Sequence, residues 1–192
     1  LALVSLAGKR PPDPRPLVDQ LHRTAQATAA VSVAIGYGAV RSGIAAVSAA
    51  AREAEQALQM GRRLNGPQAA TAFSDLGLYR FLFGIQAQPE LRSFRDDTLA
   101  PLRQADRGGV LTATLRAYLA ANGSPTDAAD HLHLHRNTVL YRLGRIEAIL
   151  GRDLRDADVR LTLHLAVKID EVLDPSASGR SAPGVRPSAT EA

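Results

Sequence analysis

Apolar and polar residues follow the period of an α-helix through the C-terminal half of the chain. Segments 110–121, 135–150 and 161–173 carry apolar side chains every three or four residues. This spacing places the apolar side chains on one face of a helix. The pattern therefore predicts an all-α domain over residues 110–173.

A shorter helix and a turn are predicted between the first two of these segments. Ser124 or Thr126 can cap the shorter helix, because their hydroxyls accept hydrogen bonds from free backbone N–H groups. Leu132 and Leu134 bracket a tight turn, and the next helix begins near His135. Two helices joined in this way form a helix-turn-helix.

The second helix of this pair has two chemically different sides. Its apolar side comprises Val139, Leu143, Ile146 and Leu150. Its remaining surface carries Arg136, Asn137, Thr138, Tyr141, Arg142 and Arg145. Arginine and asparagine near a helix N-terminus can pair with base edges in the major groove. Hydroxyl and cationic groups can hold phosphates. Periodicity alone leaves open an ordinary helical hairpin with a solvated polar face.

The N-terminal half has a different pattern, in which helical and strand-like segments alternate. We expect strands at 1–6, 31–36 and 72–73, and helices at 17–29 and 44–64. Such alternation is typical of a sheet covered by helices. The chain is thus predicted to hold an α/β domain over residues 1–85 and a helical domain over residues 110–173, so that the whole is mostly α.

Two further segments are expected to lie outside these domains. Residues 86–109 contain prolines among many charges and are interpreted as a partly helical linker, with short apolar anchors at 91–94 and 99–102 and with Gly108-Gly109 as its hinge. Residues 174–192 consist mostly of Pro, Ser, Gly, Ala and Arg. Such a composition cannot bury enough apolar surface to fold, so this tail is predicted to be disordered.

Composition narrows the class of protein without deciding its function. The 192 residues are 45% hydrophobic and 22% charged and include no cysteine, which excludes disulfides and fits a cytoplasmic protein. No apolar run reaches membrane-spanning length, and a chain that begins at Leu1 without Met suggests a fragment. The net charge is +4, yet residues 122–173 hold 7 basic and 8 acidic side chains. DNA binding is therefore argued from the pattern and not from global charge.

A family resemblance covers the segment from Leu115 to Leu173. The matching residues are Ala128-Ala129, Leu132, His135-Arg136-Asn137-Thr138, Tyr141-Arg142-Leu143, Ile146-Glu147 and 161–169. They resemble the C-terminal DNA-binding domain of PucR/CdaR-type bacterial transcriptional regulators. Residues 128–143 are also similar to the helix-turn-helix of the factor for inversion stimulation and of enhancer-binding activators. His133 stands where many such turns carry glycine, and a histidine adopts positive φ at some cost.

A second resemblance lies upstream, over residues 31–38, 50–58 and 73–79. These segments resemble the GGDEF-like domain that precedes the DNA-binding domain in the same regulators, and they are distantly similar to the second half of diguanylate cyclases. A cyclase needs a Gly-Gly-Asp/Glu-Glu-Phe turn to admit nucleotide and hold metal ions. The chain has no such run, and its place in the fold lies at or before Leu1. The resemblance implies a degenerate, structural domain and a protein that is not an enzyme.

Two apparent ligand motifs are better explained by structure. Gly36-Tyr37-Gly38 lacks the third glycine of a dinucleotide fingerprint. His131, His133 and His135 alternate by two residues, which would place successive imidazoles about 200° apart on a helix. No cysteine or carboxylate set completes a site, so neither a metal nor a cofactor is expected.

The sequence thus favours a cytoplasmic, sequence-specific transcriptional regulator whose partner is double-stranded operator DNA. The predicted DNA-binding residues are His135, Arg136, Asn137, Thr138, Tyr141, Arg142 and Arg145. The chain is expected to form a homodimer or a higher homo-oligomer, with the apolar helix 161–173 as a candidate dimer contact. A small-molecule effector would be sensed by a further N-terminal domain. Two alternatives remain open. One is a truncated cyclase-like or nucleotide-binding sensor, and the other is a protein–protein adaptor that uses the helical hairpin.

Overall fold

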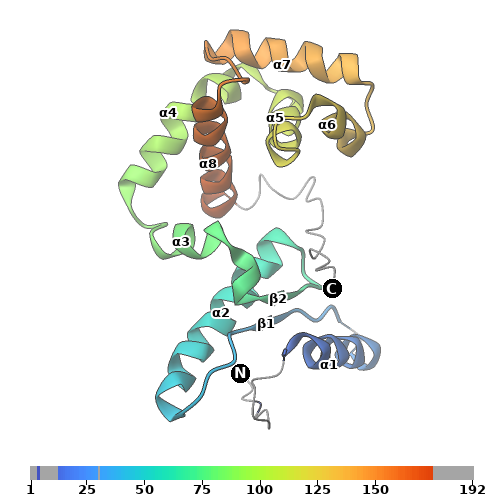
Figure 1. Ribbon diagram of the computed structural model, residues 1–192, viewed down its shortest axis with the longest axis vertical. Coiled ribbons are helices and arrows are strands. Elements are labelled where there is room, and N and C mark those ends of the chain that lie inside the picture. The colour runs from blue at the N-terminus through green and yellow to red at the C-terminus, as the bar shows by residue number, and fades with distance from the viewer. Residues whose placement is uncertain (1–3, 5–12, 30, 175–192) are drawn as a thin grey trace. The chain divides into compact units, whose positions relative to one another are not determined.

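The described part of the chain divides into two compact units. The computed structural model describes residues 4, 13–29 and 31–174 (Figure 1). One unit ends at Gly84 and the other begins at Ile85. The described residues are mostly helical, with one two-stranded parallel sheet in the first unit. This agrees with the predicted fold class, a partial α/β domain followed by an all-α domain.

The first unit combines helices with a very small sheet. Its elements are α1 (Arg15–Thr28), β1 (Ile35–Tyr37), η1 (Ile44–Ala46), α2 (Val47–Leu64), β2 (Ala70–Ala72), η2 (Phe73–Leu76) and α3 (Leu78–Gly84). β1 and β2 pair in parallel, with Ile35 opposite Ala70 and Tyr37 opposite Ala72. The predicted helices are present. The strand expected over residues 1–6 lies outside the described residues except for Val4, which has no regular structure.

The strand predicted over 31–36 is wrong in its extent. β1 begins only at Ile35, and the carbonyl of Val33 instead receives hydrogen bonds from side chains of α1. His22 Nε2 and Gln26 Nε2 each lie 2.9 Å from that oxygen. Phe73 likewise begins a 3₁₀ helix and does not extend β2. At Val33, side-chain partners from α1 thus take the place of the strand pairing that β-propensity predicted.

Helix α2 lies against the small sheet and explains Gly36 in β1 and Gly38 directly after it. A Cβ at Gly36 would lie 2.1 Å from the backbone nitrogen of Leu58, and one at Gly38 would lie 2.6 Å from the carbonyl oxygen of Ala50. The helix therefore approaches the strand too closely for any side chain at either position. The Gly36-Tyr37-Gly38 run has a packing role.

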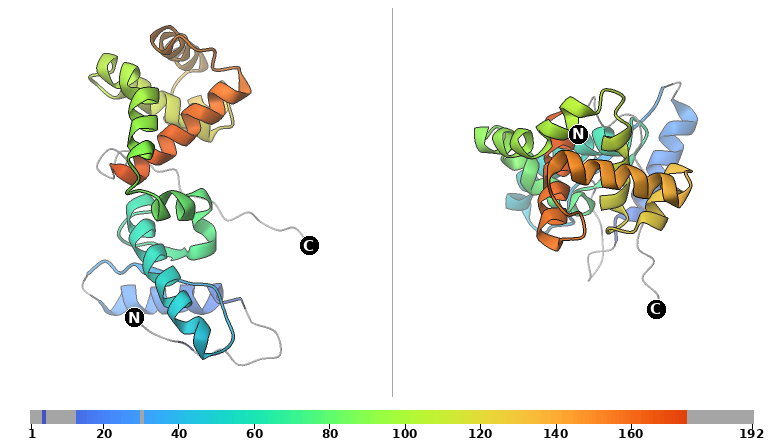
Figure 2. Two further views of the ribbon diagram at one scale, coloured as in Figure 1. Left: turned by 90° about the vertical axis from the view of Figure 1, so that its left-hand side faces the viewer. Right: turned by 90° about the horizontal axis from the view of Figure 1, so that it is seen from above.

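The second unit is all-α. It comprises α4 (Pro89–Ala105), α5 (Val110–Ala120), α6 (Pro125–Leu132), α7 (Arg136–Leu150) and α8 (Ala157–Leu173). One apolar core joins them, formed by Leu99, Leu102, Leu111, Leu115, Tyr118, Leu119, Ala128, Ala129, Val139, Leu143, Ile146, Leu154, Leu163, Ala166 and Val167. α4 and α8 pack side by side (Figure 1 and Figure 2).

The interpretation of residues 86–109 as a linker is corrected by α4. This helix spans 17 residues, and its Leu99 and Leu102 are 4% and 1% exposed within the core. Pro101 lies inside the helix without ending it. Gly109, expected in a hinge, takes a left-handed conformation with φ +70° in the tight turn between α4 and α5. The turn is fixed by Asp106, whose Oδ2 accepts hydrogen bonds from Thr112 N at 2.7 Å and Thr112 Oγ1 at 2.8 Å.

A buried carboxylate joins three helices of this unit. Asp170 on α8 is 2% exposed and accepts hydrogen bonds from Arg103 of α4 and Arg116 of α5. Arg95 of α4 adds a longer ion pair at 3.9 Å. Buried charges occur where partners compensate them, as these arginines do.

More of the apolar surface of α8 is buried within the unit than the sequence suggested. Val167, Ile169 and Val172 are 3%, 1% and 2% exposed, whereas Leu161 is 68% exposed. The apolar excess that favoured a dimer contact is thus largely buried within the chain, in part because α4 covers α8. Among the described residues, no helix has both the length and the apolarity needed to cross a bilayer.

Candidate nucleic-acid interface

Local capping interactions define the two helices of the hairpin. Ser124 caps α6, since its Oγ accepts a hydrogen bond from Asp127 N at 3.3 Å. His135 caps α7 through Nδ1, which accepts from Asn137 N at 3.2 Å. Between them His133 takes a left-handed conformation with φ 54° and ψ 43°. This positive φ was expected, because His133 stands where many helix-turn-helix turns carry glycine.

The apolar side of α7 fixes its orientation in the unit. Val139, Leu143 and Ile146 are 0%, 7% and 0% exposed, and α7 packs against both α5 and α6. Ala128 and Ala129 of α6 are also buried in the core, and small side chains there allow the helices to cross closely. The opposite side of α7 is consequently held outward by the core.

The outward side of α7 forms a continuous surface, which we call the α7 face. Its exposed residues are Arg136, Asn137, Leu140, Tyr141, Gly144, Arg145 and Ala148. Four of the seven predicted DNA-binding residues lie on it, and a fifth, the exposed His135, caps the helix beside it. Leu140 and Gly144 were missed by sequence reasoning, because a leucine at helical spacing is usually assigned to a core and a glycine carries no side-chain chemistry.

The other two predicted residues lie at the border between this face and the core. Thr138 and Arg142 are both partly buried. Arg142 Nη1 donates a hydrogen bond to Thr114 Oγ1 of α5 at 3.4 Å. Its guanidinium is thus directed toward α5, whereas Arg145 is exposed.

The charge of the α7 face is locally positive. Residues 131–146 include Arg136, Arg142 and Arg145 but no aspartate or glutamate. The next acid, Glu147, is partly buried and accepts a hydrogen bond from Leu154 N at 3.0 Å. An anionic partner therefore meets little opposing charge along the first turns of α7.

The three neighbouring histidines do not converge. His131 lies in α6, His133 in the turn and His135 at the cap of α7. Across the described ranges, no group of three or more His, Asp or Glu side chains could hold a metal ion.

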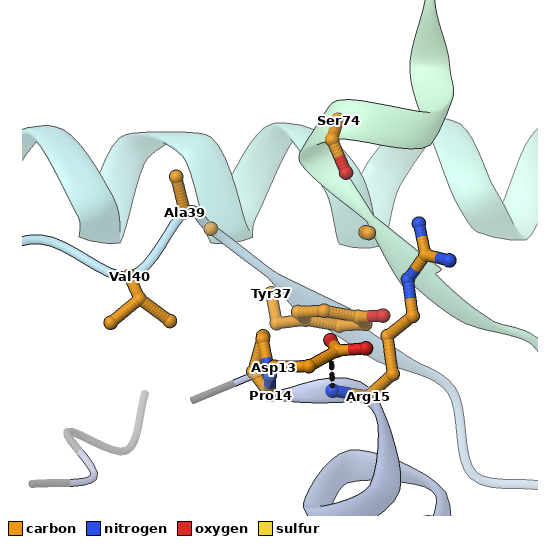
Figure 3. Close-up of a pocket in the computed structure, with 9 residues that line it drawn as sticks. Asp13, Pro14, Arg15, Tyr37, Ala39, Val40 and Ser74 are labelled. Carbon is orange, nitrogen blue, oxygen red and sulfur yellow. Dashed lines mark hydrogen bonds between the residues drawn. The ribbon is translucent and has the colours of Figure 1, made fainter. Parts of the chain in front are cut away.

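A pocket in the first unit bears on the nucleotide-binding alternative. It occupies about 320 Å³ beside the C-terminal end of β1 and is lined by Asp13, Pro14, Arg15, Tyr37, Gly38, Ala39, Val40, Ala72 and Ser74 (Figure 3). Arg15 Nη2 forms an ion pair with Asp75 Oδ1 at 3.0 Å. Burial, and secondly the charge of Asp75, raises the pKa of Tyr37. Among the described residues that line the pocket, Arg15 is already paired with Asp75, and Asp13 supplies a single carboxylate, fewer than a metal-bound triphosphate needs.

Comparison with known families finds one matching domain in each half of the chain. Residues 111–169 match the PucR C-terminal helix-turn-helix domain, and residues 1–60 match the GGDEF-like domain. The first match begins after α4, although α4 contributes to the same core. No solved structure matches the chain.

Several curated proteins are similar to the chain. The carbohydrate diacid regulator of Escherichia coli (strain K12) is 28% identical over 83% of this chain and 41% of its own length. The DNA-binding transcriptional activator AdeR of Bacillus subtilis (strain 168) is 29% identical over 71% of this chain and 33% of its own. The purine catabolism regulatory protein of the same species is 34% identical over 44% of this chain and 16% of its own. The chain thus spans less than half the length of these relatives. The chain thus carries a match to a GGDEF-like domain followed by a match to a PucR C-terminal helix-turn-helix domain, the two domains that the resemblance to PucR/CdaR-type regulators predicted.

Proposed function

We propose that this chain is the DNA-binding part of a bacterial transcriptional regulator and that α7 enters the major groove of an operator. The observation that carries the proposal is the α7 face, where Arg136 and Asn137 stand exposed in the first helical turn. Their helix is held in place by the buried side chains of Val139, Leu143 and Ile146 on its opposite side. A rigid helix with such residues at its N-terminus meets the geometric demand of major-groove recognition.

The seven predicted DNA-binding residues divide into three roles. Arg136 pairs with guanine and Asn137 with adenine, because each side chain matches the donor and acceptor pattern of that base. His135, Tyr141 and Arg145 contact the flanking phosphates. Thr138 and Arg142 stand at the border of the face and support its position. This assignment retains all seven residues that the sequence indicated.

The same proposal describes the wider protein. It is not an enzyme, a view supported by the regulator names of its relatives. It acts in the cytoplasm, where bacterial operators are. It binds as a homodimer, since one helix-turn-helix reads few base pairs and two-fold operators place half-sites about one DNA turn apart.

A selection experiment tests the function. The 192-residue chain is incubated with a pool of random duplexes, and the bound fraction is sequenced over several rounds. The proposal expects a two-fold consensus whose affinity falls steeply with salt, because phosphate contacts release counterions. Enrichment of no sequence would contradict it. Salt-insensitive binding of a protein, without a DNA shift, would favour the adaptor, and guanine-nucleotide turnover would favour the cyclase-like alternative.

A further inference from the structure

The centre of the α7 face contains two residues that hydrogen bonding and phosphate contact do not explain. Leu140 is 39% exposed although three residues of the same helix are buried. Gly144 follows it by one helical turn, and a Cβ built there meets nothing within 4 Å. By contrast, a Cβ at Gly61 of α2 would lie 2.2 Å from Thr71 Oγ1. Glycine is a poor helix former, so the described structure contains no packing reason for Gly144.

We propose that Leu140 recognises a thymine in the operator through its C5-methyl group, and that Gly144 allows the DNA to approach the backbone of α7. The inference rests on the proposed function and extends it to a specificity-determining contact. In the major groove the thymine methyl is the apolar group on the base edges. A leucine that lies among polar residues proposed to face DNA can pack against this methyl group.

The spacing along the helix supports this placement. Leu140 lies four residues after Arg136, which is about 6 Å along the helix axis. Base pairs are spaced about 3.4 Å apart, so Leu140 reaches about two steps from the base that Arg136 contacts. Arg136 and Arg145 are exposed on either side of Leu140 in the sequence. A protein partner would need a larger apolar patch than Leu140 and Tyr141 provide, whereas a cationic surface with one central leucine suits DNA.

The decisive experiment replaces thymine by uracil, which removes the methyl group and keeps every base-pairing atom. Duplexes of the selected consensus are prepared with one thymine at a time changed to deoxyuridine, and the affinity of the unchanged protein is measured for each. We expect a loss of about fourfold at one position in each half-site, which is roughly the value of one buried methyl-sized group. The substitution leaves the protein intact, so its folding cannot affect the result.

Two variants connect this loss to the protein. In Leu140→Ala the uracil substitution should no longer reduce affinity, whereas Leu21→Ala, which alters a 48% exposed leucine of α1, should retain the fourfold loss. Gly144→Ala should bind the consensus about tenfold more weakly, because the added methyl meets the DNA, while its melting temperature stays equal or rises. Gly84→Ala is the matched control, since a Cβ there also meets nothing within 4 Å.

The outcomes separate this inference from the function on which it rests. A consensus without a constant thymine would overturn the inference and leave DNA recognition intact. The same holds for uracil substitutions that have no effect, or for a loss that persists in Leu140→Ala. Unchanged affinity of Gly144→Ala would remove the role given to the glycine. If no sequence is enriched at all, the proposed function fails and the inference fails with it.

Discussion

Asp170 Oδ2 of α8 accepts a hydrogen bond from Arg116 Nη2 of α5 at 2.8 Å, across 54 residues of sequence. The carboxylate is almost fully buried, whereas the side chain of Arg116 is 21% exposed. Removing one member of a buried ion pair leaves the other charge without compensation. The pair is therefore a sensitive point of the second unit.

We expect Asp170→Asn to lower the free energy of unfolding by about 3 kcal/mol, at the low end for a broken buried pair because its arginines are partly exposed. Urea denaturation followed by circular dichroism measures the change. Asp130→Asn, which alters an exposed acid on α6, should stay within about 0.5 kcal/mol of the unchanged protein. A loss below about 1 kcal/mol for Asp170→Asn would contradict the role of the pair.

The left-handed turn at His133 predicts a stabilising substitution. His133→Gly should raise the free energy of unfolding by up to about 1 kcal/mol, because glycine adopts φ 54° without steric cost. His131→Gly, in the regular part of α6, should instead lower it by about 1 kcal/mol. Thermal unfolding of the two variants gives the comparison, and equal shifts would show that the turn is unstrained.

His164 predicts a pH dependence of stability. Burial, and secondly the charge of Lys168, holds the pKa of His164 below its ordinary value of 6.5, against an opposing effect of Glu171. The unfolded chain therefore binds a proton more readily than the folded chain. This stabilising contribution is present above about pH 6.5 and is lost as the pH falls below that value. Urea unfolding between about pH 5 and pH 7.5 should show that the free energy of unfolding of His164→Gln depends less steeply on pH than that of the unchanged protein. The control Leu161→Ala changes an exposed side chain without a titratable group and should leave the pH dependence of the free energy of unfolding unchanged.

Arg136 tests base recognition. Arg136→Ala should cost about 1 to 3 kcal/mol of binding on the selected operator and little on random DNA. The helix should persist, because Arg136 is exposed and alanine is the better helix former. Both affinities are measured at one salt concentration, with circular dichroism as the folding control. Equal losses on the two DNAs would make Arg136 a phosphate contact.

Arg145 and Arg142 are expected to differ, although both are arginines of α7. Arg145→Ala should reduce the slope of log affinity against log salt by about one unit, the effect of one lost phosphate contact. Arg142→Ala should reduce the slope less and lower stability more, because Arg142 is bonded to Thr114. Salt titrations of both variants test this, and identical slopes would show that Arg142 also reaches DNA.

The helix-turn-helix was predictable from sequence because its determinants are local. The caps at Ser124 and His135 and the left-handed turn at His133 involve only residues a few positions away. The spacing of Val139 and Leu143 indicates which side of α7 is buried. The family resemblance, confirmed by the domain matches, rests on the same segment. These features need no knowledge of distant partners.

The parts that sequence reasoning missed depend on distant contacts. Asp170 gives no local signal, since Arg103 is 67 residues away in the chain. The helix that contains Pro101 is stabilised by α8, which periodicity alone does not reveal. Val139 and Leu140 are neighbouring apolar residues, but Val139 is buried and Leu140 is exposed. The sequence alone does not distinguish them, because their burial depends on where the neighbouring helices pack.

The position of α4 has a practical consequence for dissecting the protein. A fragment cut at Gly108-Gly109, where the sequence suggests a hinge, would keep the whole helix-turn-helix but lose Leu99, Leu102 and two arginine partners of Asp170. Its exposed apolar surface would favour aggregation. A fragment beginning at Ile85 retains these contacts. Expression trials of the DNA-binding region should therefore start upstream of the segment that the family match delimits.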